Sequence, residues 1–297
     1  MTAATSNLPL PVPRFPGHPI FGNLPSFRRD RTAMQLRVAE ALPDAAGLRM
    51  GIMPCVMLSN PALAYEVLQT KASSFTKAPG LTIFLKPVLG NGLLTSEGQF
   101  HASQRKLLAP AFMHKRIASY AETMRERAAK VASSVRDGQQ LDVADLMMRL
   151  TLEIVGKTLF DAEIDGSDAD QVGDALTTAM ESALSQIQSI LPVPPFIPTP
   201  TNRRLKRAVA QLDDILYAII RARRGEKEDR GDLLSMLLAA QDEDGEVMND
   251  KQIRDEAMTL FLAGHETTAN ALAWTLYLLA KNPEARAKVE AEVDALG

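Results

Sequence analysis

One long helix, beginning after Asn249, constrains the fold more than any other feature of the sequence. The Asn249 side chain and Gln252, three residues later, match a capping box, the pair that closes the first turn of a helix. The next helix start is signalled by Asn282-Pro283, so the first helix can run from 250 to 281. At 1.5 Å per residue, about 32 residues span about 48 Å, enough to cross a whole domain. We therefore expect a fold built around this central helix.

The stretch from 258 to 280 is long and apolar enough to be tested as a membrane span. His265, Glu266 and Asn270 lie near its middle. A charge at the centre of a spanning helix costs roughly 2.5 to 3.5 kcal/mol, so the pattern is more typical of a helix buried in a soluble core. Prolines recur through the first thirty residues, which therefore contain no apolar core of the kind that a secretion signal needs. We predict a chain without a transmembrane anchor.

The middle of this helix carries a run of polar residues beside a glycine, and two interpretations are open. In the first, Gly264 allows close helix packing, Thr267 bonds back to the carbonyl of Ala263, and His265 and Glu266 face solvent. In the second, a bulge at Ala263-Gly264 opens a groove that admits a flat ligand. The Thr267 hydroxyl and the Glu266 carboxyl then supply a proton path.

The residue types exclude several classes of site. His265-Glu266 begins like the zinc-protease motif H-E-x-x-H, but the fifth position is Ala269, so the second zinc ligand is missing. Cys55 is the single cysteine and cannot form an internal disulfide, which favours a reducing compartment, the cytoplasm. The 33 Lys and Arg residues nearly balance the 36 Asp and Glu residues, giving a net charge of -3. No overall positive field attracts polyphosphate, so we expect no nucleic-acid partner.

The rest of the chain predicts a mainly α-helical protein with a small β-sheet near its N-terminus. A proline-rich arm covers 1–28, and two short strands, broken at Met53-Pro54, cover 47–58. From 97 to 297 the pattern is helical, with the long helix at 250–281. Five prolines between Leu191 and Pro200 forbid regular helix there, and this segment is either a linker or a lid over an apolar cavity. A first helix is expected after Asn60-Pro61, and from Ser96 onward the expected helices lie at 97–108, 114–136, 142–160, 170–190, 201–224, 230–241, 250–281 and 283–295.

A second constellation lies on the helix that Ser96 and Gln99 would begin with a capping box. His101 and Arg105 are four residues apart and therefore share one face of this helix. An imidazole donor beside a guanidinium makes a receptor for carboxylates. By itself, however, the pair is better explained by a solvated basic face.

The two constellations together resemble the cytochrome P-450 family of haem-thiolate monooxygenases. The residues Ala-Gly-His-Glu-Thr-Thr at 263–268 on a long helix are the specific part of the resemblance, and the His-x-x-x-Arg pair at 101–105 precedes them. The proline-rich arm, the short strands, the order of helices and the Asn282-Pro283-Glu284 helix start also follow the family's order. The resemblance covers essentially the whole chain. It implies that residues 1–297 form one incomplete domain of the cytochrome P-450 fold.

The resemblance also implies an oxygen-activating enzyme that contains haem b and acts on an apolar substrate. The family's pattern puts Ala263, Gly264 and Thr268 against the haem, and it makes Glu266 and Thr267 the catalytic pair that delivers protons. His101 and Arg105 would bind the haem propionates. Phe84, Leu94 and Ala263 would face the substrate, and residues 80–93 would form a loop lining the pocket. Residues 191–200 would then be the lid.

Further expectations concern the iron ligand and the partners. The family's Glu-x-x-Arg helix and its cysteine loop should both follow a helix like 283–295, so we expect the axial cysteine beyond Gly297 and no metal ligand within this chain. Cys55 is too far from that position in the sequence to replace it. Electrons would come from NAD(P)H through a ferredoxin or flavodoxin-type donor or a reductase. The chain alone is expected to be inactive. Two alternatives are a non-catalytic remnant or binding protein that keeps the pocket, and an unrelated all-helical scaffold.

Overall fold

The computed structural model describes residues 12–163, 166–187, 193–226, 230–240 and 247–296. The chain forms two compact units, Met1–Thr76 and Lys77–Gly297. The expected mainly α-helical fold with a small N-terminal sheet is confirmed. Its organisation as one domain stays a prediction.

The first unit contains the two-stranded antiparallel sheet, β1 (Ala45–Met50) and β2 (Met53–Leu58). The strands were expected to break at Met53-Pro54, but the turn falls between Met50 and Met53, where Gly51 has a φ of +66°. Pro54 pairs with Arg49, which is tolerated because each strand of a two-stranded sheet is an edge strand. The helical elements of this unit are α1 (Leu24–Arg29), α2 (Arg31–Ala41), α3 (Pro61–Tyr65), the π-helix η1 (Glu66–Thr70) and the 3-10 helix η2 (Ala72–Ser74).

The proline-rich arm is extended only up to α1, because α1 already begins within the predicted 1–28 segment. The Gly47 amide donates to the Pro13 carbonyl at 2.8 Å, and the Phe15 amide donates to the Gly47 carbonyl at 2.9 Å. The described part of the arm therefore lies along β1.

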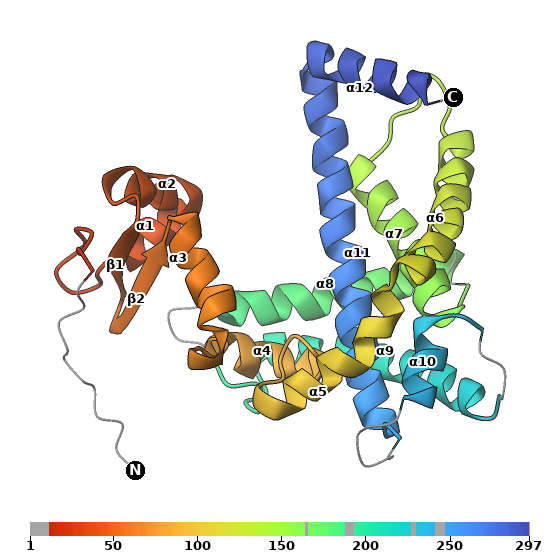
Figure 1. Ribbon diagram of the computed structural model, residues 1–297, viewed down its shortest axis with the longest axis horizontal. Coiled ribbons are helices and arrows are strands. Elements are labelled where there is room, and N and C mark those ends of the chain that lie inside the picture. The colour runs from red at the N-terminus through yellow and green to blue at the C-terminus, as the bar shows by residue number, and fades with distance from the viewer. Residues whose placement is uncertain (1–11, 164–165, 188–192, 227–229, 241–246, 297) are drawn as a thin grey trace. The chain divides into compact units, whose positions relative to one another are not determined.

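The second unit is built of helices (Figure 1). They are α4 (Pro79–Leu89), α5 (Gly98–Leu108), the 3-10 helix η3 (Ala109–Phe112), α6 (His114–Ser134), α7 (Val143–Phe160), α8 (Gly166–Ile187), α9 (Pro200–Arg224), α10 (Leu233–Ala239), α11 (Asp250–Lys281) and α12 (Pro283–Ala295). The bounds predicted for the long helix and for the last helix are confirmed. Both bonds of the Asn249–Gln252 capping box are present.

Three local predictions need correction or fall partly outside the described residues. Residues 80–93 are not a loop, because α4 occupies most of them despite an internal Pro87. The predicted Ser96–Gln99 capping box is wrong, since α5 begins at Gly98 with Glu97 as its N-cap and no side-chain cap bond. Of the linker or lid segment, 191–192 lie outside the described residues. In the remainder, the Asn202 amide group donates to the carbonyls of Pro194 and Ile197.

The long helix α11 changes character along its length. Its first half is buried against α4, α7, α9 and α10, through apolar side chains that include Ile253, Met258 and Phe261. Its last turns expose large apolar side chains such as Trp274 and Tyr277, and α12 follows them (Figure 1). Among the described helices, none combines the length and the apolar character needed to cross a bilayer.

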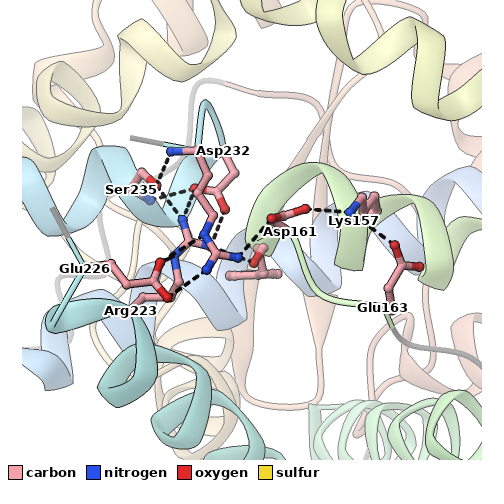
Figure 2. A network of polar contacts seen from close by, with 9 residues as sticks. Lys157, Asp161, Glu163, Arg223, Glu226, Asp232 and Ser235 are labelled. Atoms are coloured by element: carbon pink, nitrogen blue, oxygen red, sulfur yellow. Dashed lines mark hydrogen bonds and ion pairs between the residues drawn. The ribbon is translucent and has the colours of Figure 1, made fainter. Parts of the chain in front are cut away.

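A buried ion-pair network joins the C-terminal ends of α7 and α9 to the start of α10 (Figure 2). Arg223 donates to both oxygens of Asp232, at 2.8 and 3.0 Å, and also to the Phe160 carbonyl and the Ser235 hydroxyl. Asp232 in turn caps α10 by accepting from the Ser235 amide at 2.8 Å. The network thus gives hydrogen-bond partners to polar groups at three helix termini, the C-terminal ends of α7 and α9 and the start of α10.

Candidate functional site

The polar run at the middle of α11 lies on a regular helix. The Thr267 hydroxyl donates to the Ala263 carbonyl at 2.6 Å, as the first interpretation of the sequence expects. The expected bulge at Ala263-Gly264 is absent, since the α-helix continues through both residues. Ala263, Thr267 and Thr268 are exposed, and they form one face of small side chains.

The other side of the same turn faces α7. A Cβ added to Gly264 would lie 3.1 Å from Val155 Cγ2, so the glycine lets the two helices approach closely. His265 is 1% exposed, and its Nε2 lies 3.1 Å from the Met148 carbonyl of α7, so the expectation that His265 faces solvent is wrong. Burial lowers the pKa of this imidazole, while its bond to Met148 works in the opposite direction. Glu266 is half-buried.

On α5, His101 is half-buried and Arg105 is exposed. His101 Nδ1 lies 3.3 Å from the Ser96 hydroxyl and 3.5 Å from Lys77 Nζ. Burial lowers the pKa of His101, and the positive charges of Lys77 and Arg105 lower it further, against the Leu93 backbone and Glu97. Because an ammonium can only donate, a hydrogen bond from Lys77 to Nδ1 requires the tautomer that carries its hydrogen on Nε2.

Sequence reasoning missed the residues that connect α5 to α11. Lys77 Nζ donates to the carbonyls of Leu93 and Ser96, at 3.0 and 2.7 Å. The Leu93 amide donates to Glu256 Oε2 at 2.9 Å, and burial raises the pKa of Glu256 to about 7. Burial lowers the pKa of Lys77, although Glu97 and Glu256 oppose this effect. The sequence gives no clear signal of this contact, because Asp255 and Glu256 stand in the mostly polar run 250–256, beside Lys251 and Arg254.

The two residues expected to face substrate differ in exposure. Phe84 of α4 is buried, whereas Leu94 is 41% exposed in the segment between α4 and α5. The structure brings this segment to α11 through the Leu93–Glu256 bond and to His101 through Lys77 and Ser96. The roles of Phe84 and Leu94 toward a substrate stay predictions.

The residues present fit a haem. Its ring is flat and apolar, and its propionates are anions. The small exposed side chains of Ala263, Thr267 and Thr268 provide a face that a flat ring can approach. His101 and Arg105, on one face of α5, provide an imidazole donor and a guanidinium for carboxylates. Gly264 turns its Cα toward α7, so its direct contact with the ring stays a prediction.

The described residues contain no group of three or more His, Cys, Asp or Glu side chains that could hold a metal ion. Cys55 lies on β2 in the first unit, where partial burial raises the pKa of its thiol.

Comparison with known proteins decides the family. Residues 12–296 match the model of the cytochrome P-450 family. The chain belongs to this family. The alternative of an unrelated helical scaffold is thereby wrong.

Cytochrome P-450 relatives and a solved structure agree with this assignment. Cyclooctatin synthase of Streptomyces melanosporofaciens is 36% identical over 253 residues, which cover 84% of this chain and 55% of that protein. Pentalenene oxygenase of Streptomyces avermitilis is 31% identical over 254 residues, with coverage of 85% and 56%. The crystal structure of the cytochrome P-450DA heme domain has a TM-score of 0.82 and 29% identity, and the match covers 96% of this chain and 63% of that one. The chain thus spans little more than half the length of these two relatives.

Proposed function

We propose that the whole protein is a haem-dependent monooxygenase that inserts one oxygen atom of O2 into an apolar organic substrate. The observation that carries this proposal is the exposed face of Ala263, Thr267 and Thr268 at the middle of α11, within the Ala-Gly-His-Glu-Thr-Thr run. Relatives named as a monooxygenase and an oxygenase support it. Because the chain spans about half of these relatives, the activity is proposed for the whole protein.

A bound haem would supply the activation of O2. In this chain, His101 and Arg105 would bind the propionates through an imidazole hydrogen and a guanidinium, which are charge-assisted donors to a carboxylate. Ala263 has the smallest side chain that keeps the helix intact, so it leaves room beside α11 for a ring and a substrate.

Thr267 and Glu266 would handle protons. The Thr267 hydroxyl hydrogen is held by the Ala263 carbonyl, which fixes the oxygen and leaves its lone pairs free to accept a hydrogen bond. The neighbouring Glu266 carboxyl is half-buried, so it can exchange a proton with solvent while remaining close to the helix. This arrangement suits the transfer of protons toward the Thr267 side of α11.

The substrate and partners follow from composition and from relatives. The sequence before α5 contains the apolar residues Leu81, Ile83, Phe84, Leu85 and Leu94, and Leu94 is exposed, which favours an apolar substrate. Relatives are named for pentalenene and for cyclooctat-9-en-7-ol.

We propose electron delivery from NAD(P)H through a ferredoxin or flavodoxin-type donor or a reductase. We place the protein in the cytoplasm, where the single Cys55 would stay reduced.

The carbon monoxide difference spectrum of the reduced whole protein tests this function. A thiolate-type ferrous carbonyl band, together with oxygenated product from an apolar substrate, is the expected result. A haem-binding protein without any oxygenated product would instead support a binding protein that retains the pocket. Residues 1–297 alone should give no such band, and a band from them would require a new role for Cys55.

Haem anchoring is tested separately with Arg105→Ala. Removing one partner of a buried carboxylate costs about 3 to 5 kcal/mol, so haem should dissociate faster from this variant. The matched control is Arg204→Ala, which removes an exposed arginine from α9. Equal haem dissociation rates in both variants would remove Arg105 from the site.

A further inference from the structure

Two consecutive acidic residues of α11, Asp255 and Glu256, are buried and accept hydrogen bonds from one neighbouring segment. The Asn91 amide donates to Asp255 Oδ2 at 2.8 Å, and the Leu93 amide donates to Glu256 Oε2 at 2.9 Å. The two side chains are 4% and 1% exposed. Bonds to alternate amides fix both the position and the direction of the backbone between them.

Glycines bring this segment into direct contact with the helix. Gly90 has a φ of +57°, and a Cβ there would overlap the Asp255 carboxylate. A Cβ at Gly92 would overlap the Thr259 hydroxyl and the Asp255 carbonyl. The Thr95 hydroxyl donates to the Gly90 carbonyl at 2.8 Å and closes the segment on itself. The backbone therefore lies where only glycine fits.

The charges that face the two carboxylates differ. Asp255 accepts from Lys251 Nζ at 2.7 Å and from Arg254 Nη1 at 3.1 Å, so two cations balance it. Glu256 has the Leu93 amide as its hydrogen-bond donor, with attraction from Lys77 and repulsion from Asp255. Burial outweighs the stabilising contacts and raises the pKa of Glu256 to about 7. Such a perturbed carboxyl is typical of functional sites.

The same segment is bonded to α11 and, through Lys77, to one residue of the candidate haem pocket, His101. By this pocket we mean the exposed face of Ala263, Thr267 and Thr268 on α11, the His101 and Arg105 pair on α5, and Leu94. Leu93 is held on two sides, by Glu256 at its amide and by Lys77 at its carbonyl. Leu94 follows directly, and the planar peptide between them transmits the orientation of the Leu93 carbonyl to it. Lys77 also contacts the His101 imidazole, so it links this backbone to α5.

We propose that Asp255 and Glu256 are positioning residues of the candidate haem pocket: they hold the backbone from Asn91 to Leu93, and through it Leu94 and the His101 imidazole, against α11. This inference rests on the proposed function, because Leu94 and His101 serve the pocket that function requires. Neutral acceptors would satisfy the same two amides at a lower cost of desolvation, so the use of two buried carboxylates indicates that the position of this segment matters.

Amide NMR tests the contact without any haem. In the parent protein, the Leu93 amide proton should shift with a midpoint near pH 7, where Glu256 ionises, and in Glu256→Gln this shift should vanish. The Asn91 amide should respond to Asp255→Asn instead. Each variant should speed hydrogen exchange of its own amide about tenfold, because a charged acceptor is lost. The control Glu284→Gln removes an exposed carboxylate of α12 and should change neither amide.

The second measurement is the affinity of the whole protein for haem and for an apolar substrate, followed by absorption. Glu256→Gln should weaken the binding of both about tenfold, and Glu284→Gln should match the parent. A Leu93 amide that neither titrates in the parent nor exchanges faster in Glu256→Gln overturns the contact itself. Altered amides with unaltered affinities overturn the positioning role. A parent that binds no haem overturns the proposed function and this role with it, while the amides still report whether the carboxylates hold the segment.

Discussion

Arg223 should be among the most costly positions to change in this chain, although it lies outside the candidate site. Its guanidinium and the Asp232 carboxylate are 5% and 4% exposed and are joined by two hydrogen bonds. In Arg223→Met the buried Asp232 carboxylate loses both guanidinium bonds and, among the contacts between described residues, keeps its bond to the Ser235 amide. Breaking a buried pair from one side costs about 3 to 5 kcal/mol of unfolding free energy, because the remaining charge stays desolvated.

A second substitution separates this reasoning from simple loss of packing. Asp232→Asn removes the stranded charge, yet an asparagine can still cap α10. Added to Arg223→Met, it should restore about 1 to 3 kcal/mol, the cost of an unsatisfied buried polar group. Urea denaturation at pH 7, followed by circular dichroism, measures both changes.

The matched control is Arg286→Met on α12. Arg286 pairs with Glu290 at 3.0 Å, but the two side chains are 60% and 59% exposed, so this pair should contribute below about 1 kcal/mol. Two results would refute the argument: a loss for Arg223→Met as small as that of the control, or a double variant less stable than Arg223→Met.

Three further predictions concern α11. Burial raises the pKa of Glu256 from 4.5 to about 7, so the stability that this group contributes is complete below pH 4.5 and is lost as the pH rises through 7, by about 3 kcal/mol in total. Urea denaturation midpoints at pH 5 and 8 should show this loss in the parent and not in Glu256→Gln. In the whole protein, Thr267→Ala should lower product formed per electron by an order of magnitude or more and raise peroxide release, and an unchanged ratio would exclude proton delivery by Thr267. Burial lowers the pKa of His265, so its stabilising contribution is present above pH 6.5 and is lost as the pH falls. Its nitrogen-15 shifts at pH 7 should report a neutral ring with its hydrogen on Nε2, and a neutral ring with its hydrogen on Nδ1 would contradict the bond to the Met148 carbonyl.

The sequence was enough to predict the helices whose ends are marked by capping residues or a helix-starting proline close by in the chain. The ends of α11 are set by the Asn249–Gln252 box and by Asn282-Pro283, both readable within a few residues. The helix α4 could not be predicted in this way, because Gly80 and Pro87 weaken its propensity. It forms because its buried side chains pack into the core, which is tertiary information.

The start of α5 shows how a tertiary contact can override a local motif. Ser96 and Gln99 have the spacing of a capping box, but the Ser96 carbonyl accepts from Lys77 and its hydroxyl contacts His101. Glu97 takes the N-cap position instead, and its carboxylate accepts from the Lys77 amide at 2.7 Å. A lysine twenty residues earlier therefore decides where this helix begins.

The candidate site likewise contains residues that local patterns predict and residues whose role depends on contacts with distant segments. The motif on α11 and the pair on α5 are local patterns, and each lies within two turns of one helix. Asp255 and Glu256, in contrast, accept amides that lie 164 and 163 residues earlier in the chain, and backbone amides carry no mark in a sequence. In the sequence the two acids stand in the mostly polar run 250–256, beside Lys251 and Arg254, so nothing there marks them as buried. Their burial is tertiary information, and a buried carboxylate requires partners, which the Asn91 and Leu93 amides supply from a distant segment.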